Sequence, residues 1–410
     1  MKSFLAIGFI WLGCAVAWMV LGSTLLARSG DSSSALDGEV HLLWGPPMQQ
    51  SPPRAVWRQL QKRKHKVTTY SPQGQPIEQE VEREEDVAVP ISLERSDISA
   101  RIDLQHRQKG LLWFATYGVD FRASYGFQNL SGAAQVVELH FPLGTNNAVY
   151  DGFAVERVDG TPVEVAIANG EASWQDDFKA GERRDYAVRY RSRGTSSWRY
   201  ELTAGTGQVR NFHLALDTNF AEINFPAGTV SPTRHAARSG LWHGEWAFFS
   251  LVANQPIGLE LPQRVNPGPL AARITFFAPV GLLFFFFVVA NFAAIRGRVM
   301  HPLNYFFLGA AFFAFHLLFA YLVDHLALVP SFLIAAQVSI LLVVTYARLF
   351  VGWRFAVREM GIAQFVYLVL FSFSFFWPGF TGLAITVGAV LTLAVMMQVT
   401  GRVKLLQSAR

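Results

Sequence analysis

Cysteine is almost absent from this sequence, since Cys14 is the only thiol in 410 residues. A single thiol excludes an intramolecular disulfide, so any folded domain must be stabilised by buried apolar surface. The chain also lacks the nucleophile elbow of hydrolases, the HExxH zinc motif, the phosphate-binding loop and the CxxC pair. We therefore expect no catalytic, cofactor-binding or metal-binding residue, and no enzymatic activity.

Charge is missing from six long apolar runs, each free of Asp, Glu, Lys and Arg. They are Phe4–Leu26, Ile274–Ile295, Leu303–Val323, Leu328–Ala347, Met360–Trp377 and Phe380–Val399. A helix of about 20 apolar residues crosses the ~30 Å hydrocarbon layer, so all six are expected to span a membrane. The first run contains Ala15-Val16-Ala17, which resembles a signal-peptidase site. Its length and the single basic residue before it favour an uncleaved anchor.

The basic excess follows these runs. Residues 27–273 carry 26 Lys and Arg against 28 Asp and Glu, so the overall charge of +5 arises elsewhere. The other nine basic residues flank apolar runs: Lys2, Arg296, Arg298, Arg348, Arg354, Arg358, Arg402, Lys404 and Arg410. By the positive-inside rule both termini are cytoplasmic and residues 27–270 are periplasmic, in a bacterial inner membrane. The charge therefore indicates topology, and nucleic acid is not an expected partner.

Between the first and second runs the pattern is typical of β-structure. Phe121–Phe127 alternates aromatic with small or polar residues, and Tyr186–Tyr190 behaves similarly. Turn pairs such as Asn169-Gly170 separate the segments, which favours a β-sandwich. The expected fold is a membrane α + β protein. Its parts are an anchor (1–26), a juxtamembrane helix and charged hairpin (27–86), a non-cytoplasmic β-sandwich (87–270) and a five-helix transmembrane bundle (271–410).

The segments that flank the β region also carry signals. Asp31–Leu43 predicts an amphipathic helix with one apolar face formed by Leu36, Val40, Leu43 and Trp44. Gly45-Pro46-Pro47 should end this helix. Asn266–Pro269 is expected to be an irregular linker before the second span.

Complementary charge runs predict a hairpin. Lys62–Lys66 is basic, residues 78–86 are acidic, and Ser71–Gly74 between them is turn-like. Anionic lipid or nucleic acid could bind the basic run, but cross-strand ion pairing is the preferred interpretation. A register in which paired numbers sum to 148 sets Lys66 opposite Glu82.

Three sets of polar residues are candidate sites. His243 and Glu245 alternate along a predicted strand, but a metal needs a third ligand, so packing of the neighbouring Trp residues is favoured. His316 lies inside a span and is expected to be neutral and hydrogen-bonded between helices. Asp324 and His325 end the third span; acid–base chemistry is possible there, whereas the commoner role is to end a span at the headgroups.

The third span and its flanks resemble a known family. Met300-His301-Pro302-Leu303-Asn304-Tyr305 and the later Asp324-His325-Leu326 are similar to the His-Pro turn and the acid–His pair of the inner membrane protein CreD family. The resemblance implies an envelope protein associated with a two-component stress system and with tolerance to colicins and wall-directed agents. It implies no enzymatic activity, cofactor or catalytic residue. The matching signature residues are His301, Pro302, Tyr305, Asp324 and His325.

The expected function is therefore non-enzymatic envelope maintenance or stress tolerance, in which the outer β domain binds or braces an envelope component. Its expected partners are the lipid bilayer and an envelope protein or cell-wall component. A transporter or channel component is one alternative and would need polar faces along a path. A sensor that uses its periplasmic domain is another, and an enzyme would need converging His, Asp and Glu side chains.

Overall fold

The computed structural model describes residues 2–70, 76–145, 147–202, 208–297, 300–377 and 379–408. The chain divides into two compact units. The membrane unit comprises residues 1–36, 108–112 and 265–410, and the β unit comprises residues 37–107 and 113–264. The Ser71–Gly74 turn, Arg298 and Arg410 lie outside the described residues.

Within the described residues, six helical segments are long and apolar enough to cross a membrane. They are α1 (Lys2–Trp44), α2 (Pro267–Ile295), α3 (Pro302–Leu322), α4 (Leu328–Val351), the segment Trp353–Phe376, and α8 (Thr381–Ser408). The segment Trp353–Phe376 is made of α5 (Trp353–Phe355), η1 (Ala356–Gly361), α6 (Ile362–Gln364), η2 (Phe365–Leu370), α7 (Phe371–Phe373) and η3 (Ser374–Phe376). Both η1 and η2 are π-helical.

The first helix is longer than the sequence predicted. An anchor and a separate amphipathic helix were expected, whereas α1 is continuous from Lys2 to Trp44. No proline interrupts this stretch, so nothing removes a helical hydrogen bond. The helix ends as expected at Gly45, which adopts φ +118°. The predicted apolar face was partly wrong, because Val40 is buried while Leu43 is 73% exposed.

Two expected loops are helical instead. Pro267 begins α2 with Asn266 at the N-cap, so the predicted linker is the first turn of a helix. Proline is well tolerated there because the first N–H groups of a helix have no intrahelical partner. Between α4 and α5 only Gly352 interrupts the helix, with φ +82°. Arg354 and Arg358 therefore lie on helical turns rather than in a loop.

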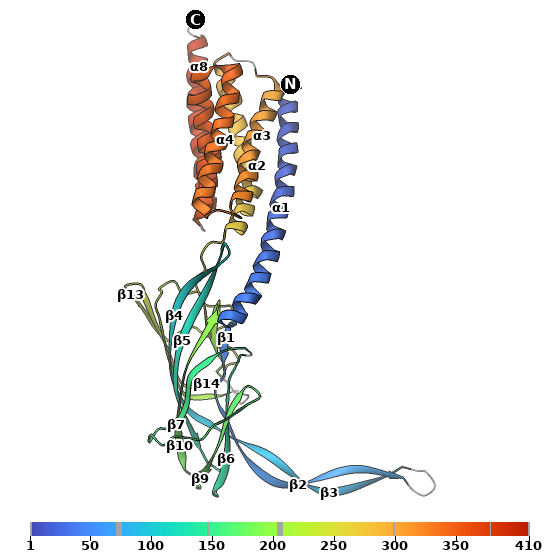
Figure 1. Cartoon of the computed structure of the whole chain (residues 1–410), viewed down its shortest axis with the longest axis vertical. Helices are drawn as coiled ribbons and strands as arrows, with labels where there is room; N and C mark the ends of the chain where they lie inside the picture. The colour runs from blue at the N-terminus through green and yellow to red at the C-terminus, as the bar shows by residue number, and fades with distance from the viewer. Residues whose placement is uncertain are drawn as a thin grey trace. The chain divides into compact units, whose positions relative to one another are not determined.

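The N-terminal helix runs beside α3 in the membrane unit (Figure 1). It shares one hydrophobic core with the other membrane helices. Trp18 is fully buried and meets Phe312 of α3 edge-on, with ring centres 5.9 Å apart. The Trp11 indole N–H donates to the carbonyl of Pro279 at 2.8 Å, an acceptor on α2. The anchor is therefore a packed member of the membrane unit.

The β unit contains three sheets. The seven-stranded sheet has the order β13 (Arg234–Arg238), β14 (Leu241–Leu251), β12 (Val209–Thr218), β4 (Leu93–Lys109), β5 (Leu112–Gln128), β10 (Arg183–Thr195) and β7 (Tyr150–Arg157). The five-stranded sheet has the order β3 (Pro76–Ile91), β2 (Arg54–Tyr70), β6 (Gln135–Pro142), β9 (Glu171–Phe178) and β8 (Ala166–Ala168). The third sheet has the order β1 (Met48–Gln50), β11 (Ser197–Tyr200) and β15 (Ile257–Glu260).

All three sheets contribute to one core. Strand alternation sends aromatic residues inward, so Phe121 stacks on Tyr190 with ring centres 4.8 Å apart. A buried carboxylate lies near the core: Asp176 accepts from Arg157 at 2.6 Å, from Tyr186 at 2.7 Å and from Arg184. Burial favours the neutral acid, but these bonds outweigh it and lower the pKa of Asp176. The core is thus large enough to fold without a disulfide.

The charged hairpin is formed by β2 and β3, which extend as a ribbon from the β unit (Figure 1). Its predicted register was wrong by two residues, because paired numbers sum to 146 and Lys66 faces Glu80. A shift of two keeps each side chain on its expected face. Ion pairs consequently form along the diagonals, such as Lys64–Glu80 at 3.5 Å.

Candidate functional site

The five signature residues occupy the two ends of α3 rather than one site. His301 caps the helix, since its Nδ1 accepts from the backbone N–H of Leu303 at 3.2 Å. Pro302 is the first helical residue, and Tyr305 is buried edge-on against Phe286, with ring centres 5.3 Å apart. Asp324 and His325 follow the other end, roughly 30 Å away for a helix of this length.

At that second end Asp324 forms an ion pair that sequence reasoning missed. Its Oδ2 lies 2.8 Å from Nη2 of Arg28 on α1, and Arg28 also donates to the carbonyl of Ala320 at 3.2 Å. The Arg28 guanidinium lies 5.3 Å from the ring centre of Tyr321. His325 is exposed. These contacts join α1 to α3 and bring no acid–base pair together.

Two polar side chains within the membrane helices, Ser339 and Gln364, link neighbouring helices, whereas His316 bonds within its own helix. His316 Nδ1 lies 3.1 Å from the carbonyl of Phe312, one turn earlier in α3, so the expected bond between helices was wrong. Gln364, which the sequence did not single out, donates to Ser339 Oγ at 2.8 Å. Ser339 in turn donates to the carbonyl of Ala311 at 2.7 Å. The Gln364 side-chain oxygen is buried without a hydrogen-bond partner.

His243 lies on β14 between two carboxylates. Its Nδ1 is 2.7 Å from Asp217, a residue of β12 that sequence reasoning missed, and its Nε2 is 3.2 Å from Glu245. The bond to Asp217 is the main cause that raises the pKa of His243. Trp242 and Trp246 on the same strand are buried, as expected. Across the described residues no group of three His, Cys, Asp or Glu side chains could hold a metal ion.

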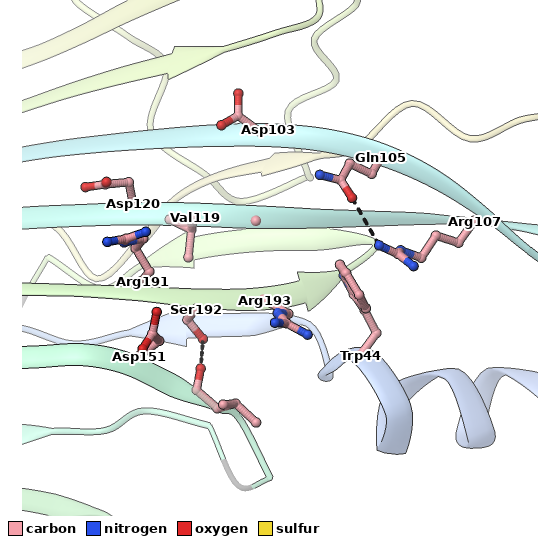
Figure 2. A pocket seen from close by; sticks show the side chains of 12 residues that line it. Trp44, Asp103, Gln105, Arg107, Val119, Asp120, Asp151, Arg191, Ser192 and Arg193 are labelled. Carbon is pink, nitrogen blue, oxygen red and sulfur yellow. Dashed lines mark hydrogen bonds between the residues drawn. The ribbon is translucent and has the colours of Figure 1, made fainter.

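A groove of about 620 Å³ lies on the surface of the β unit (Figure 2). Its polar lining comes from β4, β5, β7, β10 and the end of α1: Asp103, Gln105, Arg107, Asp120, Asp151, Arg191, Arg193 and Trp44. Alternation along the strands turns these side chains away from the core. We call this surface the arginine groove.

One tryptophan orders one end of the arginine groove. The guanidinium carbons of Arg107 and Arg193 lie 3.6 and 4.8 Å from the centre of the Trp44 ring (Figure 2). Gly45 makes this position possible, because any Cβ there would lie 2.5 Å from the carbonyl oxygen of Arg193. Thr195 completes the attachment by donating to the carbonyl of Gly45 at 3.1 Å. The sequence placed Trp44 on an apolar helix face, not beside cations.

Charge in the arginine groove is unevenly paired. Asp103 lies 3.4 Å from Arg101, and Asp120 lies 3.2 Å from Arg122, both on the outer face of their own strands. Within the described part of the chain, Arg107, Arg191 and Arg193 have no carboxylate oxygen within 4.0 Å. Among the residues that the structure describes, the groove therefore presents three guanidinium groups and the carboxylate of Asp151 without an ion-pair partner within 4.0 Å.

With the geometry established, comparison with known proteins identifies the C-terminal region. Residues 247–405 match the family described as inner membrane protein CreD. The match includes α2 to α7 and most of α8, and it contains all five signature residues. It confirms the CreD resemblance inferred from the His-Pro turn. The matched residues are less than half of the chain, and they contain five of the six described helices that are long and apolar enough to contact a lipid bilayer.

Other comparisons add little to the CreD match. No curated protein matches the chain. A putative nutrient binding protein from Legionella pneumophila is 13% identical over 48% of this chain and 73% of its own, with a TM-score of 0.32. An M1 zinc metallopeptidase from Deinococcus radiodurans is 10% identical over 68% of this chain and 93% of its own, with a TM-score of 0.27. Scores this low carry no information about activity or ligand.

Proposed function

We propose that this protein is a non-enzymatic platform of the bacterial cell envelope. The membrane unit holds it in the inner membrane, and the β unit, which we place in the periplasm as a sandwich, binds or braces an envelope protein or wall component. The observation that carries this proposal is the arginine groove, where ordered guanidinium groups lack carboxylate partners. Such groups suit recognition of a partner.

The lining of the arginine groove does not suit catalysis. Its described side chains include one hydroxyl, Ser192, and this hydroxyl donates to the carbonyl of Val149 at 2.7 Å. Among the described lining residues there is no histidine or lysine to act as its base. A nucleophile needs such a neighbour to become reactive at neutral pH. Binding is therefore the role that this chemistry supports.

The polar groups of the membrane helices also favour a platform over a transporter. Gln364 donates to Ser339 and Ser339 donates to the carbonyl of Ala311, so these side chains link three membrane helices. Arg28 of α1 pairs with Asp324, which follows α3, and Arg296 pairs with Glu359 of η1, so each of these two carboxylates is held by an arginine. A coupled transporter would use ionisable groups deeper in the spans. We also propose that both termini are cytoplasmic, because the basic residues flank the spans on that side.

Deletion of the gene tests the proposed function. We expect the deletion strain to become more sensitive to detergents and wall-directed agents, and expression of the intact chain to restore tolerance. Reporter fusions provide the matched topology test: a fusion at Asp324 should report the periplasm, and a fusion at Gly297 the cytoplasm. Unchanged sensitivity after deletion, or a cytoplasmic signal at Asp324, would contradict the proposal.

A further inference from the structure

The arginine groove has a feature that binding of an anion would explain. The guanidinium groups of Arg107 and Arg193 both lie over the Trp44 ring, which Figure 2 shows between them. Each is attracted to the ring, an interaction of roughly 0.5–1 kcal/mol at an exposed site, but the two cations repel each other. An anion beside either guanidinium would reduce this repulsion, and no described residue places a carboxylate oxygen within 4.0 Å of either one.

Arg191 extends the same surface along β10. Residues 191 and 193 point to the same side of the strand because side chains alternate, and both line the arginine groove. Arg191 lies directly between Asp120 on β5 and Asp151 on β7 in the strand register. Neither approaches it within 4.0 Å, and Asp120 is already paired with Arg122 at 3.2 Å. Arg191 therefore adds a third guanidinium to the surface, with the carboxylate of Asp151 on the neighbouring strand.

The floor of the arginine groove is open beside these cations. Gly118 of β5 pairs with Arg193 of β10, and a Cβ built on Gly118 would meet no atom within 4 Å. Its backbone is not in the left-handed region, so a larger residue would fit without backbone strain. The missing side chain leaves room for a ligand next to the guanidinium of Arg193.

We propose that the arginine groove binds an oxyanion, a phosphate or carboxylate group, through Arg107, Arg191 and Arg193. This proposal rests on the proposed function and names the chemistry of the envelope component that the β unit takes. Guanidinium forks match both oxyanions in a bidentate manner. The stacking of Arg107 and Arg193 on Trp44 fixes their orientation before the ligand arrives, which reduces the entropy lost on binding. The oxyanion belongs either to a soluble wall fragment or to a lipid headgroup.

Titration of the full chain in neutral phosphatidylcholine nanodiscs tests this site. The soluble probes are sodium pyrophosphate and N-acetylmuramic acid, followed by calorimetry. The lipid probe is phosphatidylglycerol, added to the protein in neutral detergent and followed by native mass spectrometry. Binding of a soluble probe assigns the site to a wall-type ligand, and binding of phosphatidylglycerol alone assigns it to a headgroup.

Two groove variants and a matched control distinguish binding in the arginine groove from nonspecific binding to surface arginines. Arg193→Gln removes one charge-assisted interaction, so we expect affinity to fall about tenfold or more. Gly118→Leu fills the floor and should weaken binding without removing any charge. Arg189→Gln is the control, because Arg189 points to the same side of β10 but is paired with Glu156 at 3.0 Å. Its affinity should stay within about twofold of the parent chain.

The outcomes separate this inference from the proposed function. Absence of binding by all three probes, or equal losses in Arg189→Gln and Arg193→Gln, would overturn the oxyanion site. If the deletion strain is nevertheless sensitive to envelope stress, the platform stands and its ligand has other chemistry. If the probes bind but deletion changes no tolerance, the site stands and the proposed function fails.

Discussion

The ion pair between Arg28 and Asp324 links a family-signature residue to the N-terminal helix, and its loss should have a modest cost. The side chain of Asp324 is 43% exposed and that of Arg28 is 41% exposed. The pair itself therefore contributes roughly 0.2–1 kcal/mol to the free energy of unfolding. Arg28 also donates to a carbonyl near the end of α3 and lies beside Tyr321. Asp324→Ala should therefore destabilise by about 0.5 kcal/mol, and Arg28→Ala by about 1–2 kcal/mol.

The single cysteine provides the assay. The Cys14 thiol lies 3.2 Å from where a Cβ on Gly309 of α3 would stand, so opening of the α1–α3 contact exposes it. Thermal unfolding in detergent can be followed with a thiol-reactive dye. The expected order of midpoints is parent, then Asp324→Ala, then Arg28→Ala, with the double variant close to Arg28→Ala. Arg273→Ala, at an exposed position on α2, is the control.

Either of two results would contradict a modest contribution of the Arg28–Asp324 pair to stability. A loss above about 2 kcal/mol in Asp324→Ala would mean that Asp324 has a buried role that its exposure does not show. Equal midpoints for the parent and Arg28→Ala would mean that the contacts of Arg28 do not hold α1 against α3.

Three further predictions concern the β unit. Cysteines at Lys64 and Glu82 should form a disulfide in the ribbon more readily than cysteines at Lys66 and Glu82, as mass spectrometry would show; the reverse preference would restore the register summing to 148. Asp176→Asn should lower the free energy of unfolding by about 2–4 kcal/mol, because two arginines lose their buried carboxylate. The parent loses this stability as pH falls below 3.8 through the lowered pKa of Asp176, and the variant should not show that loss. An unchanged denaturation midpoint would contradict this. His243 has a raised pKa, so the stability that its ion pairs contribute is complete below pH 6.5 and is lost as pH rises through that pKa. His243→Gln should therefore flatten the plot of unfolding free energy against pH above pH 6.5. An identical plot would show that the contacts of His243 do not contribute to stability.

Membrane spans were predictable from the sequence because length and apolarity decide them. The ends of the helices were not. Asn266–Pro269 contains signals for a break, yet proline is also a favoured first residue of a helix, and the structure uses it so at Pro267. The charged ribbon was predictable from its complementary runs. Its register was not, since a shift of two residues preserves both facing and charge complementarity.

The arginine groove was beyond prediction because it depends on residues distant in the sequence. Trp44, Arg107 and Arg193 meet only when α1 ends beside β4 and β10. A local pattern did exist at Gly45, which follows the tryptophan, but one glycine does not reveal which carbonyl approaches it. The pairing of Arg28 with Asp324 was hidden for the same reason. The CreD signature consequently marked helix ends and gave no guide to the groove.

The most direct test of the platform is to measure protein abundance and envelope-stress tolerance together in His301→Ala and Asp324→Ala. His301 caps α3 and Asp324 joins it to α1, so both residues act on folding in this account. We predict that tolerance falls only as far as abundance falls, and that raised expression restores it. Full abundance with complete loss of tolerance in either variant would contradict the account and indicate an active transport or catalytic site.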